Sequence, residues 1–423
     1  MMKKLKILSI NKYYRLAGGA DREMFNIEKI LIENGHEVIP FSTVSKENNK
    51  NDWNDYFIDG LNIEDLEKET LTKKLKKFSR IIYNFQAKRN LLKLLDVVTP
   101  DVAHLHNIHY EISPSVIHAL ERKNIPIVMH LHDMRLFCPN GVFFTQGKFC
   151  QACIYNKFYN ALFKKCVQNS YKASLAAMLA NYLQYFLRIW KKHIDRYIIP
   201  TNILTDMSIK YGIPKNKIDT FDYYIDANNY VVSDNYEPYF VFFGFQGVSK
   251  GIMNVLKALK ILQTEGFTNY KLKIFGNKGP VTNDIIKFID DNSLSNNIEY
   301  LGFVEDEILF KEISNSLFVI IPSIGSENSN CVIRESNALG KMVLGSKIGG
   351  IPEQIVDGET GLLFNTNDLN DLSSKIKFLF ENPDTAKEWG RKSRVHVEKR
   401  SDKQFFYDQL MQTYTKAIEN YNN

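Results

Sequence analysis

Short apolar runs recur along the chain at intervals that leave room for one helix between each run and the next. Runs of this length, bounded by polar or turn-forming residues, are typical of buried strands in a parallel sheet. In the first half the predicted strands are Leu5–Ile10, Glu37–Phe41, Val102–Leu105, Ile127–His130 and Tyr197–Ile199. In the second half they are Tyr239–Phe243, Lys271–Phe275, Glu299–Leu301, Leu317–Ile321 and Met342–Ser346. Amphipathic segments separate them, so strands are expected to alternate with helices.

A polar stretch at residues 226–238 separates the two sets of strands and is interpreted as a linker. With 423 residues, the chain is too long for one typical hydrophobic core and long enough for two domains of about 200 residues. We therefore expect one domain at 1–225, a second at 239–400 and a terminal helix at 401–423. The predicted fold class is α/β, with two Rossmann-like doubly wound parallel-sheet domains facing across a cleft.

Charge is distributed unevenly between the two halves. The net charge is +6, and residues 1–200 alone carry +11, which leaves −5 for the remainder. The sequence contains no uninterrupted apolar stretch of about 18 residues, so no transmembrane helix is expected. The apolar run after Lys3 and Lys4 is too short for a signal peptide, which favours a cytoplasmic protein.

The segment 322–336 offers a candidate binding site. A buried strand ends at Pro322, small polar residues follow, and a helical pattern begins near Cys331. The first backbone N–H groups of a helix lack intrahelical partners and bind anions such as phosphate. Glu327 and Glu335, with seven residues between them, place hydrogen-bond acceptors for hydroxyl groups on either side of this turn.

This segment resembles the Glu-x7-Glu signature of family 4 of the retaining glycosyltransferases, in the form whose first glutamate is followed by Asn-Ser. The family's later motifs follow in order at Gly340, 349–353, 357–358 and 361–364. Met342 stands where the family usually has proline. The resemblance implies the GT-B fold, with Glu335 binding the donor ribose and Glu327 a hydroxyl of the transferred sugar. The donor loop comprises Glu327, Asn328, Ser329 and Asn330.

Two glycines, Gly18 and Gly19, precede a helix in the first domain. Glycine lets a backbone approach a phosphate closely, although a lone Gly-Gly pair is more often an ordinary loop. Its place is similar to that of the family's N-terminal loop, which faces the donor diphosphate.

Five histidines lie near the ends of two predicted strands, at 104–109 and 130–132. Ligands bind at this edge of doubly wound sheets, and clustered histidines also raise the alternative of zinc. Their places resemble the family's acceptor-side loops, and the resemblance makes His132 the first-domain residue nearest the reacting sugar.

Four cysteines, Cys138, Cys150, Cys153 and Cys166, lie together in the segment 138–166. Four thiolates suffice for a tetrahedral structural zinc, whereas the alternative is cysteines that merely pack. The sequence from His132 to Gly141 also resembles that of a subgroup of family 4 enzymes. A bound zinc would order a loop on the acceptor side.

The segment from Tyr171 to Trp190 repeats apolar residues at helical spacing and is followed by Lys191 and Lys192. Residues 73–80 form a second basic segment with apolar residues interleaved. Such stretches dock on an anionic inner membrane surface, or else form packed helices with a solvated basic face.

Lys250, after the predicted strand at 239–243, is placed to neutralise a leaving diphosphate. Phe245 stands where the family usually has arginine, so leaving-group stabilisation is expected to weaken unless Arg15, Arg22 or Arg334 substitutes. The chain contains no strict Asp-x-Asp motif, which fits a metal-independent reaction with no cofactor required for catalysis.

The predicted function is transfer of a sugar, with retention, from a nucleotide-diphosphate sugar to a lipid-linked or oligosaccharide acceptor. The expected setting is capsule, O-antigen or exopolysaccharide assembly at the inner face of the membrane, with no nucleic-acid partner. Two alternatives remain open: an epimerase or hydrolase of sugar nucleotides, and a catalytically weak binding subunit.

Overall fold

The computed structural model describes residues 3–61, 70, 77 and 79–422. Within it the chain divides into two compact units. The first comprises Met1–Gly141, Gln151–Tyr224 and Lys403–Asn423, and the second comprises Val142–Cys150 and Ile225–Asp402. The short hairpin of β5 (Phe144–Thr145) and β6 (Lys148–Phe149) therefore groups with the second unit, although it lies inside the cysteine-rich segment assigned to the first domain.

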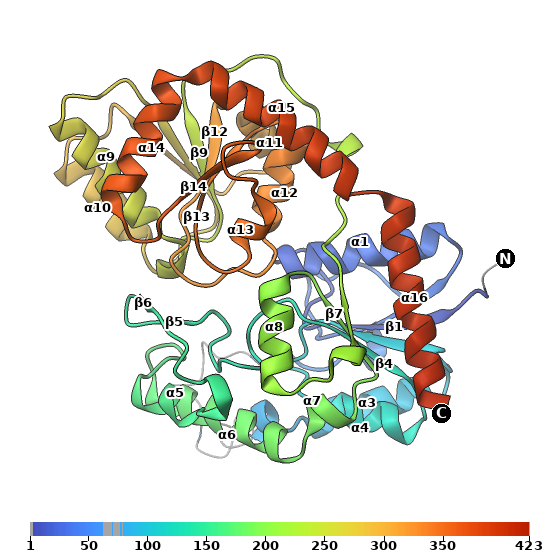
Figure 1. Cartoon of the computed structure of the whole chain (residues 1–423). Helices are drawn as coiled ribbons and strands as arrows, with labels where there is room; N and C mark the ends of the chain where they lie inside the picture. Colours follow the sequence, from blue (N-terminus) through green and yellow to red (C-terminus); the bar gives the residue numbers. More distant parts are fainter. Residues whose placement is uncertain (1–2, 62–69, 71–76, 78, 423) are drawn as a thin grey trace. The chain divides into compact units, whose positions relative to one another are not determined.

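The first unit is built on six parallel strands in the order β2-β1-β3-β4-β7-β8 (Figure 1). The strands are β1 (Lys6–Ile10), β2 (Glu37–Phe41), β3 (Val102–Leu105), β4 (Ile127–His130), β7 (Arg196–Ile199) and β8 (Ile218–Thr220). Its helices are α1 (Gly19–Glu33), α3 (Phe85–Leu95), α4 (Ser115–Arg122), α5 (Tyr159–Phe163), α6 (Tyr171–Phe186), α7 (Ile189–Lys192), α8 (Asn202–Tyr211) and α16 (Lys403–Asn422).

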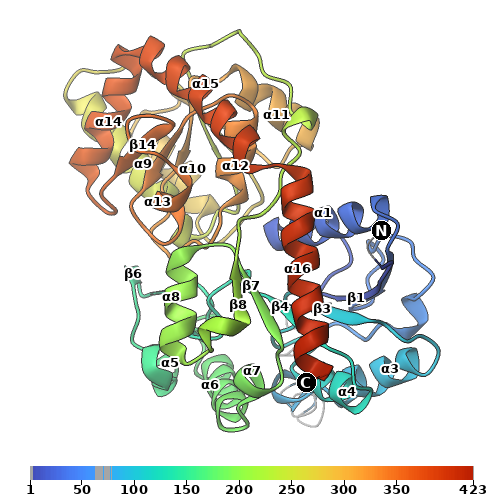
Figure 2. The ribbon, with the colours of Figure 1, turned by 45° about the vertical axis from the view of Figure 1, so that its right-hand side comes forward.

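The C-terminal helix α16 completes the core of the first unit. Leu410 and Tyr414 pack with Ile7, Ile27 and Val102 in one buried cluster, to which α16, α1 and the sheet all contribute. Figure 2 shows the ribbon of α16 running alongside this sheet. These five side chains are fully buried. Each contributes roughly 1.5–3 kcal/mol through burial, so the last 20 residues are part of this domain's stability.

The second unit repeats the architecture, with strand order β11-β10-β9-β12-β13-β14. The strands are β9 (Phe240–Phe243), β10 (Leu272–Phe275), β11 (Ile298–Gly302), β12 (Phe318–Ile321), β13 (Val343–Ser346) and β14 (Gly361–Phe364). Its helices are α9 (Ile252–Thr264), α10 (Thr282–Asp291), α11 (Asp306–Asn315), α12 (Cys331–Ala338), α13 (Ile351–Gln354), α14 (Leu369–Glu381) and α15 (Pro383–Arg400).

All ten predicted strands are present, and the prediction of two Rossmann-like doubly wound domains is confirmed. The sequence pattern missed β8 and β14, which lie at sheet edges. Because an edge strand needs no continuous apolar run, β8 carries Asp219, which pairs with Arg196 on the neighbouring strand. β14 begins at a glycine, where a Cβ would come within 2.5 Å of the Val343 carbonyl oxygen.

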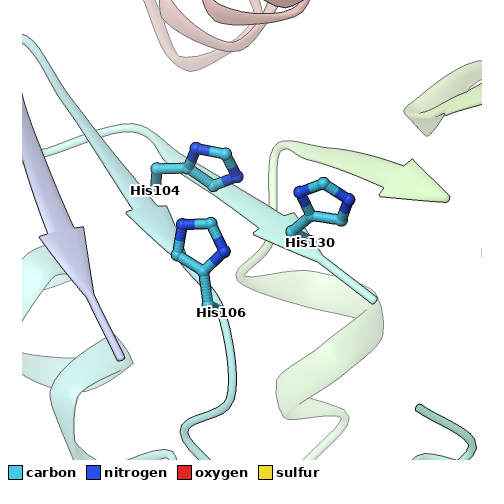
Figure 3. Close-up of side chains that lie close together, drawn as sticks. All are labelled: His104, His106 and His130. Carbon is cyan, nitrogen blue, oxygen red and sulfur yellow. The ribbon is translucent and has the colours of Figure 1, made fainter. Parts of the chain in front are cut away.

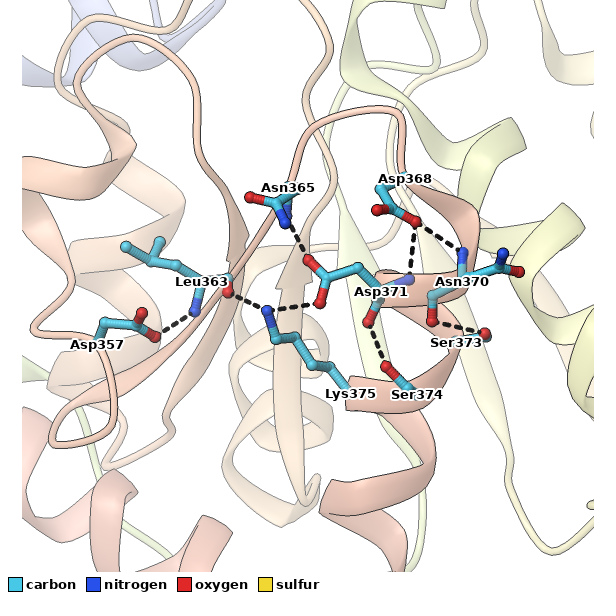
Figure 4. A network of polar contacts seen from close by, with 9 residues as sticks. All are labelled: Asp357, Leu363, Asn365, Asp368, Asn370, Asp371, Ser373, Ser374 and Lys375. Carbon is cyan, nitrogen blue, oxygen red and sulfur yellow. Dashed lines mark hydrogen bonds and ion pairs between the residues drawn. The ribbon is translucent and has the colours of Figure 1, made fainter.

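The connection from β14 to α14 is fixed by a polar network (Figure 4). The Asp368 side chain caps α14 by accepting hydrogen bonds from the backbone N–H groups of Asn370 and Asp371. The Lys375 ammonium bridges the Asp371 carboxylate at 2.8 Å and the Leu363 carbonyl oxygen at 2.7 Å. The network ties the first turns of the helix to the edge strand.

Lys341, between α12 and β13, is a buried cation. Its side chain is 0 % exposed, and no described residue hydrogen-bonds its Nζ, which lies 3.3 Å from the centre of the Tyr236 ring. Burial lowers the pKa of Lys341 to about 7, although the nearby Asp234 carboxylate raises it in part.

We expect the Lys341→Met substitution to raise the free energy of unfolding at pH 7 by about 1–3 kcal/mol, because it removes an unsatisfied buried ammonium. Between about pH 7 and the ordinary lysine pKa of 10.5, the unfolded chain holds a proton that the folded lysine has lost. Stability of the unaltered protein should therefore rise with pH across that window, and the rise should be smaller in the variant. Urea unfolding at pH 7, 8.5 and 10 measures both effects, and a variant less stable at pH 7 would contradict them.

Candidate functional site

Both sheets reverse their strand order at one point, and ligands bind at such points in doubly wound folds. In the second unit the reversal lies between β9 and β12, which pair in parallel through Phe240 and Phe318. In the first unit it lies between β1 and β3. The loops that leave these four strands carry most of the predicted site residues.

The two loops of the second unit are locked together. The backbone N–H groups of Ile324 and Gly325 both donate to the Ser249 carbonyl oxygen, at 2.8 and 3.0 Å. Gly251 has φ +74°, and a Cβ there would lie 1.8 Å from the Pro322 carbonyl oxygen. Only glycine fits this close approach, so Gly251 holds the turn at 248–250 against the donor loop.

Glu327 and Lys250 meet in this place. The Lys250 ammonium lies 2.8 Å from Glu327 Oε1, which also accepts a hydrogen bond from the Ser323 hydroxyl at 2.7 Å. Burial by itself lowers the pKa of Lys250, but the Glu327 carboxylate more than offsets this and the net pKa is raised. Lys250 therefore carries its charge at neutral pH.

The backbone of Glu327 is fixed by a second loop. Its carbonyl oxygen accepts a hydrogen bond from the Gly350 N–H at 2.8 Å. Gly349 has φ +55°, and a Cβ at this position would lie 2.2 Å from the same carbonyl oxygen. Glycine at position 349 is therefore required for the position of Glu327, which the Gly350 N–H holds.

The remaining donor-side residues surround the N-terminus of α12. The Asn330 side chain caps this helix by accepting from the Val332 N–H, and Gln354 Oε1 accepts from the Asn330 N–H at 2.7 Å. The Ser329 hydroxyl accepts hydrogen bonds from the Gln354 amide and the Arg334 guanidinium. The helix N-terminus is thus held toward the same loop that carries Glu327.

Glu335 and Asn328 belong to the same segment and are both buried. Glu335, 4 % exposed, lies on α12 within two turns of the helix N-terminus. A carboxylate accepts hydrogen bonds, and binding of the donor ribose by Glu335 stays a prediction.

The structure bears on which arginine could take the place of the one that the family usually has where this chain has Phe245. Phe245 is 52 % exposed, and Arg15 forms an ion pair with Glu47. Arg334 donates to Ser329 in the donor loop. Arg334 is thus held at the predicted diphosphate site within the second unit, whereas Arg15 and Arg22 belong to the first unit.

In the first unit, His132 is held on both sides. Its Nδ1 lies 2.8 Å from the Tyr223 hydroxyl, and its Nε2 lies 2.9 Å from His106 Nδ1. Burial lowers the pKa of His132 to about 4, and the nearby Asp133 carboxylate offsets this only in part. His132 is therefore neutral at physiological pH.

Behind His132 the rings of His104, His106 and His130 lie close together (Figure 3). Ring centres of His104 and His106 are 4.3 Å apart, and those of His130 and His132 are 4.4 Å apart. His104 Nδ1 contacts the Tyr414 hydroxyl at 2.8 Å, whereas no described residue hydrogen-bonds His104 Nε2 or either ring nitrogen of His130. One nitrogen from each of the three rings lies within 4.8 Å of the others, so the group could hold a metal ion.

The two N-terminal glycines start α1. Gly18 is its N-cap in an extended conformation that any residue adopts, and Gly19 is its first residue. Asp21 in the first turn accepts a hydrogen bond from the Asn11 amide at 2.7 Å. Binding of a diphosphate by Gly18 and Gly19 stays a prediction.

The cysteines differ in burial. Cys138 and Cys153 are buried, whereas Cys150 and Cys166 are partly exposed. Cys153 and Cys166 border one apolar cluster with Phe158. A structural zinc held by these four cysteines stays a prediction.

The sequence did not reveal three residues that support the site. Ser323 holds Glu327, Gln354 holds the donor loop, and Tyr223 holds His132. Small or amide side chains carry no signal of their own. Only the position of Ser323 directly after Pro322, at the end of a strand, marked it in the sequence.

None of the described helices is long and apolar enough to cross a bilayer. The basic segment at 73–80 lies mostly outside the described residues.

Two family models match the chain. Residues 17–228 match the model described as Glycosyltransferase Family 4, and residues 230–396 match the model described as Glycosyl transferases group 1. The first alone matches half of the chain.

Curated relatives match over shorter stretches. The uncharacterized glycosyltransferase MJ1178 of Methanocaldococcus jannaschii is 30% identical over 36% of this chain and 40% of its own length. The capsular polysaccharide biosynthesis glycosyltransferase CapM of Staphylococcus aureus is 23% identical over 50% of this chain and 52% of its own. The chain thus spans about half, or less, of the length of these relatives.

Solved structures match over nearly the whole chain. Anabaena Alr3699/HepE, in complex with UDP and glucose, has a TM-score of 0.68 at 16% identity, covering 97% of this chain and 99% of that one. TarM has a TM-score of 0.68 at 13% identity, covering 97% and 99%. At these identities the likeness shows the fold, which is GT-B.

Proposed function

The chain belongs to the glycosyltransferases of family 4, and from that premise we propose that it transfers a sugar from a nucleotide-diphosphate sugar to an acceptor hydroxyl with retention of configuration. The observation that carries the proposal is the group formed by Lys250, Glu327 and Ser323. A cation, a carboxylate and a helix N-terminus meet where the second sheet reverses its order. This arrangement suits a sugar diphosphate.

In the proposed reaction the bond between the anomeric carbon and the diphosphate oxygen breaks, and the acceptor oxygen bonds to the same face of that carbon. The acceptor proton passes to the departing phosphate, so no separate base is needed. Lys250 stabilises the negative charge that develops on the leaving group. Glu327 holds a hydroxyl of the transferred sugar, and Glu335 the ribose.

His132 is assigned to the acceptor side. Its imidazole is neutral, and both ring nitrogens are engaged by Tyr223 and His106, so they add no charge near the reacting carbon. In this proposal the backbone carbonyl of His132 accepts the hydrogen bond from the sugar hydroxyl. The metal ion that serves many sugar-nucleotide enzymes is replaced in this proposal by Lys250 and the N-terminus of α12.

The acceptor is proposed to be lipid-linked or an oligosaccharide of a surface polysaccharide. CapM, one of the relatives, is named for capsular polysaccharide biosynthesis. The basic excess in the first 200 residues supports an acceptor that is delivered at an anionic membrane surface.

The test is the thermal stabilisation of the purified protein by a panel of nucleotide-diphosphate sugars. We expect one donor to raise Tm, and the Glu335→Gln variant, which keeps the shape of the side chain, to lose at least about tenfold in affinity. Glu265→Ala, an exposed glutamate of the same unit, is the matched control and should bind as the unaltered protein does.

The outcomes separate the proposal from its rivals. Release of free sugar at an undiminished rate without acceptor would indicate a hydrolase, and conversion of the donor to an epimer would indicate an epimerase. Absence of binding to every donor by folded protein would contradict the proposal.

A further inference from the structure

Helix α6 of the first unit buries mainly small and polar side chains and leaves several large apolar side chains exposed. Its buried residues are Ser174, Ala176, Ala177, Ala180, Asn181 and Gln184. Its exposed residues include Leu175, Leu179, Leu183 and Phe186, and Leu187 directly after it is exposed too. An ordinary surface helix turns its large apolar side chains toward the core.

Hydrogen bonds on the inner face fix this orientation. The Ser174 hydroxyl accepts from the Val167 N–H at 3.1 Å, and Gln184 Oε1 accepts from the buried Trp190 indole N–H at 3.0 Å. Rotating α6 to bury its leucines would leave these polar groups unpaired, at a cost of roughly 1–3 kcal/mol each. The leucine face is therefore held outward by the fold.

The neighbouring segment adds exposed aromatic side chains. Helix α5 packs against α6 (Figures 1 and 2). Tyr155, Tyr159 and Phe163 on this side, and Tyr171 at the start of α6, are exposed; Phe163 is 73 % exposed and Phe186 72 %. We call the following exposed apolar residues of α5, of α6 and of the positions flanking them the α6 surface: Tyr155, Tyr159, Phe163, Tyr171, Leu175, Leu179, Leu183, Phe186 and Leu187.

The charged residues in the segment that carries the α6 surface are all basic. Residues 151–194 contain seven Lys or Arg residues and no Asp or Glu. Lys157, Lys172, Arg188 and Lys192 are exposed among them. Exposed apolar and aromatic side chains bordered by cations are typical of surfaces that lie in the headgroup region of an anionic bilayer.

We propose that the α6 surface docks on an anionic lipid bilayer, with the leucines and aromatic rings inserted at the headgroup boundary and the cations on lipid phosphates. A second copy of this chain fits the surface less well. A symmetric contact would bring two basic surfaces together, and residues 151–194 offer no acidic side chains to pair with them. The proposal rests on the proposed function only in that the bilayer would carry the acceptor; its geometry is independent of the donor site.

The test is co-sedimentation of the full chain with vesicles of phosphatidylcholine, with and without phosphatidylglycerol. We expect binding only to the anionic vesicles, weakening as salt is raised. The double variant Leu179→Ser with Phe186→Ser should lower the partition coefficient at least about tenfold. Ile286→Ser with Val395→Ser, exposed apolar residues of the second unit, is the matched control and should leave binding unchanged.

A second pair tests the charge. Lys172→Glu with Arg188→Glu should weaken binding by about tenfold or more and flatten its salt dependence, whereas Lys257→Glu on α9 should change neither. Equal binding to neutral and anionic vesicles, or full binding by either pair of α6 variants, would overturn the proposal.

Two further measurements distinguish a bilayer from a second copy of the chain, and the docking proposal from the proposed function. A dimer in light scattering that the Leu179→Ser, Phe186→Ser variant abolishes would assign the surface to a second copy and overturn the bilayer. Donor stabilisation without vesicle binding would leave the proposed function standing and remove the docking surface, and vesicle binding without donor stabilisation would do the reverse.

Discussion

The Lys250→Ala variant is expected to lower kcat by about 10²- to 10³-fold, because it removes the cation assigned to the leaving diphosphate. The loss should appear mainly in kcat, since the charge on the leaving group is larger in the transition state than in the bound donor. Initial rates at saturating donor and acceptor measure it.

Two controls sharpen this result. Lys257→Ala removes an exposed lysine of the same unit and should leave kcat within about twofold of the unaltered enzyme. Because Lys250 and Glu327 share one ion pair, the double variant Lys250→Ala, Glu327→Ala should cost less than the two single losses combined. If Lys250→Ala retained nearly full kcat, another cation would have to carry the charge, and Arg334 would be the first to substitute.

Acidification is expected to destabilise the first unit steeply below pH 6.5. Burial lowers the pKa of His104 to about 3 and those of His109 and His132 to about 4, and it holds the pKa values of His106 and His130 well below 6.5. Below pH 6.5 the unfolded chain therefore binds protons that the folded chain does not. Stability is present above that pH and is lost as pH falls toward the folded values.

The size of the effect follows from the number of groups. Well below pH 6.5 each such histidine removes about 1.4 kcal/mol per pH unit. Because the unfolded imidazole is only half protonated at pH 6.5, each removes about 1 kcal/mol between pH 6.5 and 5.5, and five of them remove on the order of 5 kcal/mol. Glu28 offsets part of this loss of stability. Burial raises its pKa to about 7, so below that pH the folded chain holds a proton that the unfolded glutamate binds only at lower pH. The net loss is comparable to the whole stability of many domains.

Unfolding by urea at pH 7.5, 6.5 and 5.5 measures this dependence, and His130→Leu is its matched variant. The variant removes one titrating group and two ring nitrogens without described hydrogen-bond partners, so its loss of stability between pH 6.5 and 5.5 should be smaller by about 1 kcal/mol. A slope unchanged in His130→Leu would show that this ring is protonated in the folded state. If EDTA reproduced the acid effect at pH 7.5, a metal ion at the histidine cluster would be the cause.

The hydrophobic pattern alone was enough to predict the two doubly wound domains. Eight of the ten predicted strands lie in the interior of a parallel sheet, where burial on both faces favours apolar runs that are visible in one dimension, and β2 and β11 lie at edges. The two strands that were missed, β8 and β14, also lie at sheet edges, and β8 is a short, partly exposed strand of mixed composition. The helical spacing of the leucines in α6 was visible in the sequence, but the sequence could not show that these leucines would be exposed.

The sequence also determined which residues could form the site, because Glu327, Glu335, Lys250 and His132 each follow a predicted strand. Tertiary structure decided which of them meet. Lys250 and Glu327, 77 positions apart, are joined because β9 and β12 are neighbours in the sheet and Gly251 permits close approach of their loops. Whether a histidine is charged likewise depends on burial among distant residues such as Tyr414, and burial is a property of the folded core.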